Sequence, residues 1–251
     1  CAPEVEEPLQ AQPIDPPTVT MSFIVNDSPL AGTEGDKVTS RVIRDRLLKE
    51  AEGNVALKVE EASEKDSFHV SGRGELQLAV LIETMRREGF ELAVSRPAVI
   101  EREIDGVLCE PWELVTVDFA EDYQGGVMTR LASRKGELLN MTPDGRGRMR
   151  LEYRIPARGL IGFRTEYLTA TSGTGLLYHV FEKYAPKVPG DIGQRHNGVL
   201  VSNVQGKALA YALFNLQERG SLFLGHGAEV YEGMLVGIHS RDNDLPVNPT
   251  K

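Results

Sequence analysis

The chain has little cysteine, few aromatic side chains and no long apolar run. Its 251 residues include two cysteines, Cys1 and Cys109, and aromatic residues make up 6% of the total. Two cysteines are too few for a disulfide framework, and neither a Cys-x-x-Cys pair nor a His/Cys cluster with zinc spacing occurs. No apolar run approaches the roughly 18 residues that a spanning helix needs. We therefore expect no metal, no membrane contact and a cytoplasmic location.

The sequence also lacks the motifs of nucleotide and hydrolase chemistry. A phosphate-binding GxxxxGK[ST] loop is absent, because Gly206-Lys207 is followed by Ala208 and lacks the earlier glycine. No GxSxG nucleophile turn is present, and the five histidines are scattered along the chain. We expect no catalytic residue and no cofactor in this chain.

The net charge of −9 is unevenly distributed. Residues 1–122 carry 12 Lys/Arg against 26 Asp/Glu, residues 123–180 carry 9 against 4, and residues 181–251 carry 7 of each. One explanation is ordinary local variation in charge. The other is that a basic middle domain faces phosphates while an acidic first domain faces solvent or a neighbouring domain.

Residues 1–17 are rich in proline and glutamate and contain few large apolar side chains. Such a segment cannot bury enough apolar surface to fold alone, so we expect a linker. The first residue is Cys rather than Met, which favours a chain that is internal to a longer protein.

Residues 18–96 predict one domain with the order β-α-β-β-α-β. Its clearest signal is at Gly72 and Gly74. Before these glycines, polar and apolar residues alternate as in a strand, and after them the apolar residues follow the period of a helix. The expected strands are residues 18–25, 55–60, 68–71 and 91–95, and the expected helices are residues 39–52 and 74–89. This order is that of the ferredoxin-like split βαβ fold.

Residues 97–185 repeat the same order. Strands are expected at residues 113–121, 137–140, 149–155 and 175–184, and helices at residues 125–135 and 159–170. Residues 186–251 follow a Val188-Pro189-Gly190-Asp191 breaker and predict a mixed domain with a helix at 207–219 and a loop-like end after Arg241. The predicted fold class is α+β: two consecutive ferredoxin-like domains and a mixed α/β C-terminal domain.

The basic middle segment holds the candidate site. Arg146, Arg148 and Arg150 alternate, which would place them on one side of a strand, where they repel one another unless a polyanion or carboxylates face them. Arg130, Arg134 and Lys135 fall at helical spacing and could share one helix edge. The functional interpretation is RNA binding through phosphates and shape, and the alternative is a solvated arginine face.

Three further residues are weaker RNA-binding candidates: Arg195, His196 and Lys207. His196 stands in a polar, glycine-flanked segment, where an exposed side chain is expected. Recognition in the style of an RNA-recognition motif is not expected, because its aromatic run is absent.

Several stretches resemble elongation factor G-like translational GTPases, in particular their domains III and V. These stretches are residues 71–76 (SGRGEL), 110–113 (EPWE), 123–128 (YQGGVM) and 134–136 (RKG). More narrowly, the chain resembles the BipA (TypA) subgroup at residues 38–41 (VTSR), 83–97 (ETMRREGFELAVSRP) and 156–165 (PARGLIGFRT). Another elongation factor G relative such as LepA fits less well at residues 160–163 and after residue 186.

This resemblance implies the C-terminal part of a cytoplasmic, ribosome-binding GTPase tied to stress or cold adaptation and to large-subunit assembly. Its implied partners are ribosomal RNA, ribosomal proteins, transfer RNA near its acceptor end, and N-terminal GTPase and barrel domains that would use GTP and Mg²⁺. A monomer is expected. In the family the last domain continues past an Asn-Pro-Thr-Lys segment into a basic loop, so the domain at 186–251 is expected to be incomplete.

A function of another class also fits the predicted fold. Paired ferredoxin-like domains can act as regulatory modules that bind small molecules at a sheet interface. That alternative explains the architecture but gives the arginine-rich segment no role.

Overall fold

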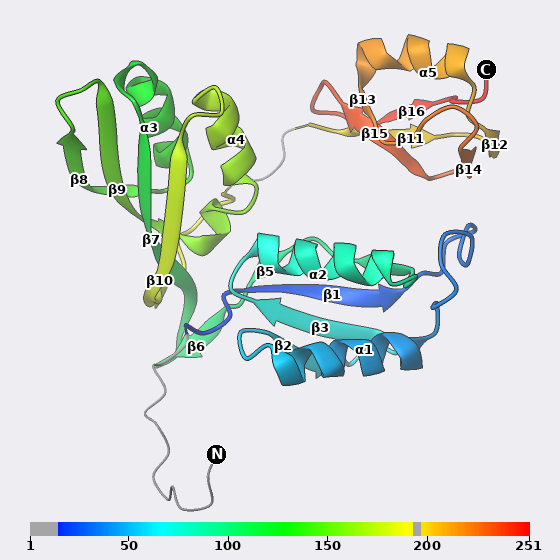
Figure 1. Ribbon diagram of the computed structural model, residues 1–251, viewed down its shortest axis with the longest axis horizontal. Coiled ribbons are helices and arrows are strands. Elements are labelled where there is room, and N and C mark those ends of the chain that lie inside the picture. Colours follow the sequence, from blue (N-terminus) through cyan, green and yellow to red (C-terminus); the bar gives the residue numbers. More distant parts are fainter. Residues whose placement is uncertain (1–14, 193–196) are drawn as a thin grey trace, which may run out of the picture. The chain divides into compact units, whose positions relative to one another are not determined.

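The computed structural model describes residues 15–192 and 197–251, and it divides into two compact units between Gly193 and Gln194 (Figure 1). Among the described residues, the first unit contains two separate five-stranded sheets, and the second contains a four-stranded sheet and a two-stranded one. Within the described residues, no helix is both long and apolar enough to cross a membrane.

The first sheet is built from residues 19–99. Its strands are β1 (Val19–Val25), β2 (Lys58–Glu61), β3 (Ser67–Gly72), β4 (Leu92–Val94) and β5 (Ala98–Val99), and its helices are α1 (Ser40–Gly53) and α2 (Glu75–Arg87). The strand order is β2-β3-β1-β4, with β5 also paired to β1, and all pairs are antiparallel.

Alternation along β1 explains why both helices cover one face of this sheet. Val19, Met21 and Phe23 are buried, whereas the residues between them pack less deeply or face outward. Ile43 of α1 and Leu78 of α2 belong to the same core as these strand residues. The 3.6-residue period of each helix therefore supplies one apolar stripe to a shared interior.

The second sheet repeats the arrangement. Its strands are β6 (Arg102–Ile104), β7 (Val107–Ala120), β8 (Glu137–Pro143), β9 (Arg148–Pro156) and β10 (Leu176–Pro186). Its helices are α3 (Gln124–Ser133) and α4 (Phe163–Ala170), with short 3₁₀ turns η1 (Glu121–Tyr123) and η2 (Ala157–Gly159). The order is β10-β7-β9-β8, with β6 on β7. This is the strand order of the first sheet, and the predicted pair of ferredoxin-like domains is confirmed.

The second unit has the mixed α/β composition that was predicted. Its elements are β11 (Val199–Ser202), β12 (Gly206–Lys207), α5 (Ala210–Leu216), η3 (Gln217–Arg219), β13 (Gly220–Leu222), β14 (Glu229–Val230), β15 (Leu235–His239) and β16 (Leu245–Val247). The main sheet has the order β13-β15-β11-β16.

The expectation of a loop after Arg241 is wrong. Strand β16 pairs in parallel with β11, and Val247 is buried. The strand escapes sequence analysis because it is three residues long and contains Pro246, which is tolerated at a sheet edge. A segment this short shows no measurable alternation.

The segment after β10 belongs to the first unit, although a domain boundary was predicted at residue 186. The buried carboxylate of Glu110 accepts a hydrogen bond from the backbone N–H of Val188 at 2.8 Å and pairs with Arg158 at 2.5 Å. Arg158 also donates to the backbone carbonyls of Val188 and Gly190. This network ties residues 188–190 to β7 and η2, so the chain leaves the domain later than its composition suggests.

We predict that Arg158→Met destabilises the first unit by about 3–5 kcal/mol, because it leaves the buried Glu110 carboxylate without its cation. The measurement is urea denaturation followed through Trp112, the single tryptophan, which lies in β7. Arg146→Met, at an exposed turn, is the control and should change stability by less than about 0.5 kcal/mol. Equal stabilities for the two variants would contradict this role for Glu110.

A second buried carboxylate lies further along β7. Glu113 is 4% exposed, and its Oε2 lies 2.5 Å from Nδ1 of His179 on β10. The hydrogen bond and charge of Glu113 raise the pKa of His179 above its ordinary value, against the opposing effect of burial.

We predict a pH dependence of stability from this pair. A pKa raised in the folded state means that the stabilisation is fully present below about pH 6.5 and is lost as pH rises through the folded-state pKa. Thermal unfolding of the wild type should therefore shift downward between pH 6 and pH 8.5, and His179→Gln should flatten that dependence. His69→Gln, at an exposed position, is the control. A dependence that survives His179→Gln unchanged would assign it to another group.

Candidate nucleic-acid interface

Arg146 lies at the tip of the turn between β8 and β9. The carboxylate of Asp144 accepts hydrogen bonds from the backbone N–H groups of Arg146 at 2.7 Å and Arg148 at 2.9 Å. Gly145 and Gly147 have φ values of 70° and 86°, a conformation that favours glycine. The three arginines therefore do not share one strand: β9 begins at Arg148, and Arg146 projects from the exposed turn before it.

Arg148 and Arg150 share one carboxylate. Nε of Arg148 donates to Oδ1 of Asp118 at 2.7 Å, and Nη2 of Arg150 lies 3.4 Å from Oδ2 of the same residue. The two arginine side chains keep 39% and 60% of their surface exposed. Asp118 and Asp144 supply two carboxylates against the three guanidinium groups of this segment, so the β8–β9 turn and the start of β9 retain a small net positive charge.

These arginines border the sheet face opposite α3 and α4, here called the open face. Core residues such as Val117, Leu151 and Leu177 point toward the helices, so their neighbours along each strand point away from them. Tyr178 and Val180 of β10 lie on the open face and are 63% and 56% exposed. Arg154 on this face is paired with Glu182 at 2.6 Å. Beyond the Arg146–Arg150 segment, the open face is therefore charge-balanced and partly apolar.

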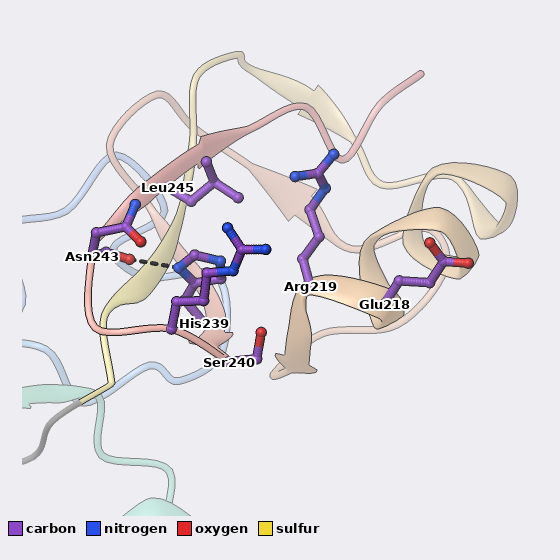
Figure 2. A pocket seen from close by; sticks show the side chains of 7 residues that line it. Glu218, Arg219, His239, Ser240, Asn243 and Leu245 are labelled. Atoms are coloured by element: carbon purple, nitrogen blue, oxygen red, sulfur yellow. Dashed lines mark hydrogen bonds between the residues drawn. The ribbon is translucent and has the colours of Figure 1, made fainter.

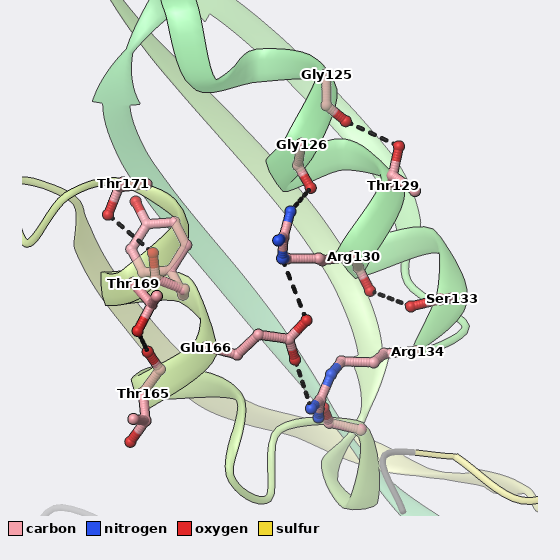
Figure 3. A network of polar contacts seen from close by, with 12 residues as sticks. Gly125, Gly126, Thr129, Arg130, Ser133, Arg134, Thr165, Glu166, Thr169 and Thr171 are labelled. Atoms are coloured by element: carbon pink, nitrogen blue, oxygen red, sulfur yellow. Dashed lines mark hydrogen bonds and ion pairs between the residues drawn. The ribbon is translucent and has the colours of Figure 1, made fainter. Parts of the chain in front are cut away.

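Arg130 and Arg134 are joined through one acid on the neighbouring helix. Glu166 of α4 lies 3.3 Å from Arg130 and 2.8 Å from Arg134 (Figure 3). Arg134 also donates to the carbonyls of Gly159 and Ile161, at 2.6 and 3.1 Å, and stacks over Phe163. With 12% of its side chain exposed, Arg134 joins α3 to η2 and α4, whereas Arg130 keeps 41% exposed.

The helix-edge prediction needs a correction. Helix α3 ends at Ser133, and Lys135 has a left-handed φ of 63°, so Lys135 lies beyond the helix and not on its edge. The N–H of Gly136 closes the end of the helix by donating to the carbonyl of Leu131. Lys135 is exposed and has no acidic partner among the residues that the structure describes.

The structure describes one of the three weaker RNA-binding candidates. Arg195 and His196 lie outside the described residues. Lys207 of β12 is 68% exposed and lies 3.7 Å from Glu229 of β14, an exposed pair that holds neither side chain firmly.

Two arginines of the second unit were not identified from the sequence. Arg219 and Arg241 line a cavity of about 160 Å³ beside His239, whose Nδ1 lies 2.6 Å from the carbonyl of Asn243 (Figure 2). In Figure 2 the side chains of Glu218 and Arg219 point apart. No ion pair of Arg219 or Arg241 occurs within the described ranges, 15–192 and 197–251. Arg219 and Arg241 lie far apart in the sequence and belong to no cluster of charged residues, so the sequence does not indicate that they line the same cavity.

The second unit also exposes aromatic side chains. Tyr211 and Phe214 are 74% and 70% exposed and stand three residues apart on α5, which places them on one face of the helix. Phe223, after β13, is 60% exposed. Exposed aromatic rings near arginines can stack on unpaired bases while the cations meet phosphates. The sequence gives only a weak signal for them, because an Ala/Leu-rich helix looks like core.

The described residues carry no cluster of three or more His, Cys, Asp or Glu side chains able to hold a metal ion. The chemistry that the described surface supports is electrostatic and stacking contact. Arg146, Arg150 and Lys135 are exposed cations of the second ferredoxin-like domain, and the second unit exposes the rings of Tyr211, Phe214 and Phe223.

Two family models match adjacent parts of the chain. The model of the elongation factor G C-terminus matches residues 107–196, and the model of the TypA/BipA C-terminal domain matches residues 197–251. The junction between the two matches falls within four residues of the boundary between the compact units.

Alignments with several bacterial proteins cover nearly the whole chain. The chain is 65% identical over 248 residues to the large ribosomal subunit assembly factor BipA of Salmonella typhimurium, and 64% identical to that of Escherichia coli K12. It is 57% identical to that of Buchnera aphidicola. Each match covers 99% of this chain and 41% of the relative, so the chain spans about two fifths of the length of these relatives. Together with the family models, these matches show that the chain belongs to the TypA/BipA family.

Proposed function

We propose that this chain is the ribosome-binding part of a large-subunit assembly factor, and that it binds ribosomal RNA chiefly through phosphate contacts. The support is that relatives more than 60% identical are named large ribosomal subunit assembly factors. The observation that carries the RNA contact is the segment Arg146–Arg150, where Arg148 and Arg150 share Asp118 and the guanidinium group of Arg146 makes no ion pair among the described residues.

The second ferredoxin-like domain is proposed as the main anchor. Lys135, Arg146 and Arg150 are exposed, and charge of this kind attracts a polyanion without reading its sequence. Arg130 is a weaker contact because Glu166 partly neutralises it. Arg134 is left out of the proposed RNA contacts, since its guanidinium donors are used inside the protein.

The second unit is proposed to contact less regular RNA, including the acceptor end of a transfer RNA. Tyr211, Phe214 and Phe223 offer stacking surfaces, and Arg219, Arg241 and Lys207 offer charge. Arg195 and His196 remain proposed contacts on sequence grounds alone. Single-stranded ends suit such a surface because their bases are free to stack.

Hydrolysis of GTP with Mg²⁺ is proposed for GTPase and barrel domains outside this chain, and a role in stress or cold adaptation is proposed for the whole protein. We further propose that it acts in the cytoplasm as a monomer and touches ribosomal proteins as well as RNA. The chain itself has no phosphate-binding loop and is proposed to bind no guanine nucleotide. Heat released on titration with GTP, in protein free of contaminating GTPases, would count against that part.

We predict that the triple variant Arg146→Ala, Arg148→Ala, Arg150→Ala binds isolated large ribosomal subunits at least tenfold more weakly at 100 mM salt. The slope of log affinity against log salt should fall by about three units, because each lost phosphate contact releases about one counterion fewer. The measurement is a binding titration across a salt series.

The matched control is Arg41→Ala, Arg86→Ala, Arg87→Ala, three exposed helix arginines of the first domain. It should keep wild-type affinity and slope. If the control loses affinity while the triple variant at the turn does not, the anchor lies in the acidic first domain and the assignment fails.

Arg134→Met separates a structural arginine from a binding one. We predict a loss of about 2–3 kcal/mol in the free energy of unfolding, because the bonds to two carbonyls and Glu166 are removed together. Lys135→Met, one residue later, should be neutral for stability. Urea denaturation measures the free energy of unfolding of both variants. If Arg134→Met is as stable as Lys135→Met, the structural role of Arg134 is contradicted and Arg134 becomes a candidate RNA contact again.

A further inference from the structure

A cavity of about 240 Å³ lies between the two ferredoxin-like domains of the first unit. Its apolar wall comes from both domains, with Val19 and Leu76 on one side and Leu160, Phe163 and Leu177 on the other. Leu76 is 65% exposed although it lies in the first turn of α2. An exposed leucine beside a concave apolar wall is what a bound apolar group would cover.

The domains already touch across this cavity. The backbone N–H of Gly162 donates to both carboxylate oxygens of Glu75, at 3.0 and 3.2 Å. Gly74, before α2, faces the ring of His179, since a Cβ at Gly74 would lie 4.0 Å from Cε1 of that ring. The cavity is therefore framed by fixed groups from each domain.

Two helices begin at this cavity. Gly74 is the N-cap of α2, and Gly162 is the N-cap of α4. Helix N-termini carry partial positive charge and favour anions. The N-terminus of α4 already meets the carboxylate of Glu75, so the N-terminus of α2 is the one that remains for a bound anion.

Two arginines add full positive charge. Arg73 and Arg164 line the cavity, are exposed, and have no ion pair among the residues that the structure describes. The two acids in the wall are already engaged, Glu75 by Gly162 and Glu113 by His179. The two acids are therefore each held by a partner, while both arginines keep guanidinium donors free for a ligand.

We propose that this cavity binds a small organic anion with an apolar body, of the class of medium-chain carboxylates, with its carboxylate toward Arg73 and Arg164. The apolar chain lies against Leu76, Leu160 and Leu177. Because the wall belongs to both domains, the bound molecule joins α2 to α4 and strengthens the contact that Glu75 and Gly162 make alone. The proposal concerns the free chain and is independent of ribosome binding.

The test uses octanoate as the probe, with the complete 251-residue chain labelled with ¹⁵N. Titration should shift the backbone amide of Gly162 and those of Arg73 to Leu76. Octylamine, with the same apolar body and the opposite charge, and acetate, with the charge but no apolar body, should bind at least tenfold more weakly. Equal binding of octanoate and octylamine, or shifts confined to residues near Tyr211 and Phe214, would overturn the proposal.

Two variants locate the site. Arg73→Gln with Arg164→Gln should weaken octanoate binding about tenfold, the effect expected from losing charge-assisted hydrogen bonds. Arg41→Gln with Arg96→Gln, also exposed arginines, is the matched control and should leave affinity unchanged. Ile161→Trp, which fills the cavity from a half-buried position, should abolish binding. Undiminished affinity in the Arg73/Arg164 variant would refute the proposal whether or not Ile161→Trp folds.

Discussion

The second ferredoxin-like domain depends on arginines whose charge is met inside the protein. Arg158 holds the fully buried Glu110 and two carbonyls of the following segment, and Arg134 joins three pieces of chain through Glu166 and two more carbonyls. An arginine at such a place satisfies several acceptors at once, which a lysine cannot do with the same geometry. The domain uses part of its basic excess for its own packing. The remainder, which includes Lys135, Arg164 and the turn around Arg146, is exposed and available to a polyanion.

The course of the two ferredoxin-like domains was predictable from the sequence because each strand and helix has enough residues to show its period. Strand β1 alternates over seven residues and α2 keeps its apolar stripe over thirteen. The elements that escaped prediction are short: β16 has three residues and gains its stability from pairing with β11. The C-terminal boundary of the second ferredoxin-like domain was not predictable for a different reason. It depends on Glu110, whose partner Val188 lies 78 residues later in the sequence.

The candidate site was predictable in composition but not in geometry. The sequence identifies where arginines gather, yet it cannot tell that Asp118, about 30 residues away, faces Arg148 and Arg150. The two glycines around Arg146 bend the chain before the strand begins, so alternation fails there. The exposed aromatic side chains of α5 were not predictable either. A short helix rich in alanine and leucine has the same sequence pattern whether its outer face is covered or exposed. Membership of the TypA/BipA family comes from the comparisons with known proteins. Which arginines are free to bind a ligand depends on the partner of each side chain, and only the structure shows these partners.

The most direct test of this division of arginines is their reactivity toward phenylglyoxal, read by mass spectrometry in the free chain and in the chain bound to large ribosomal subunits. The account predicts that Arg146 reacts quickly in the free chain and is protected in the complex, whereas Arg134 and Arg158 react slowly in both. Fast reaction of Arg134 in the free chain, or equal reactivity of Arg146 in the two states, would contradict it.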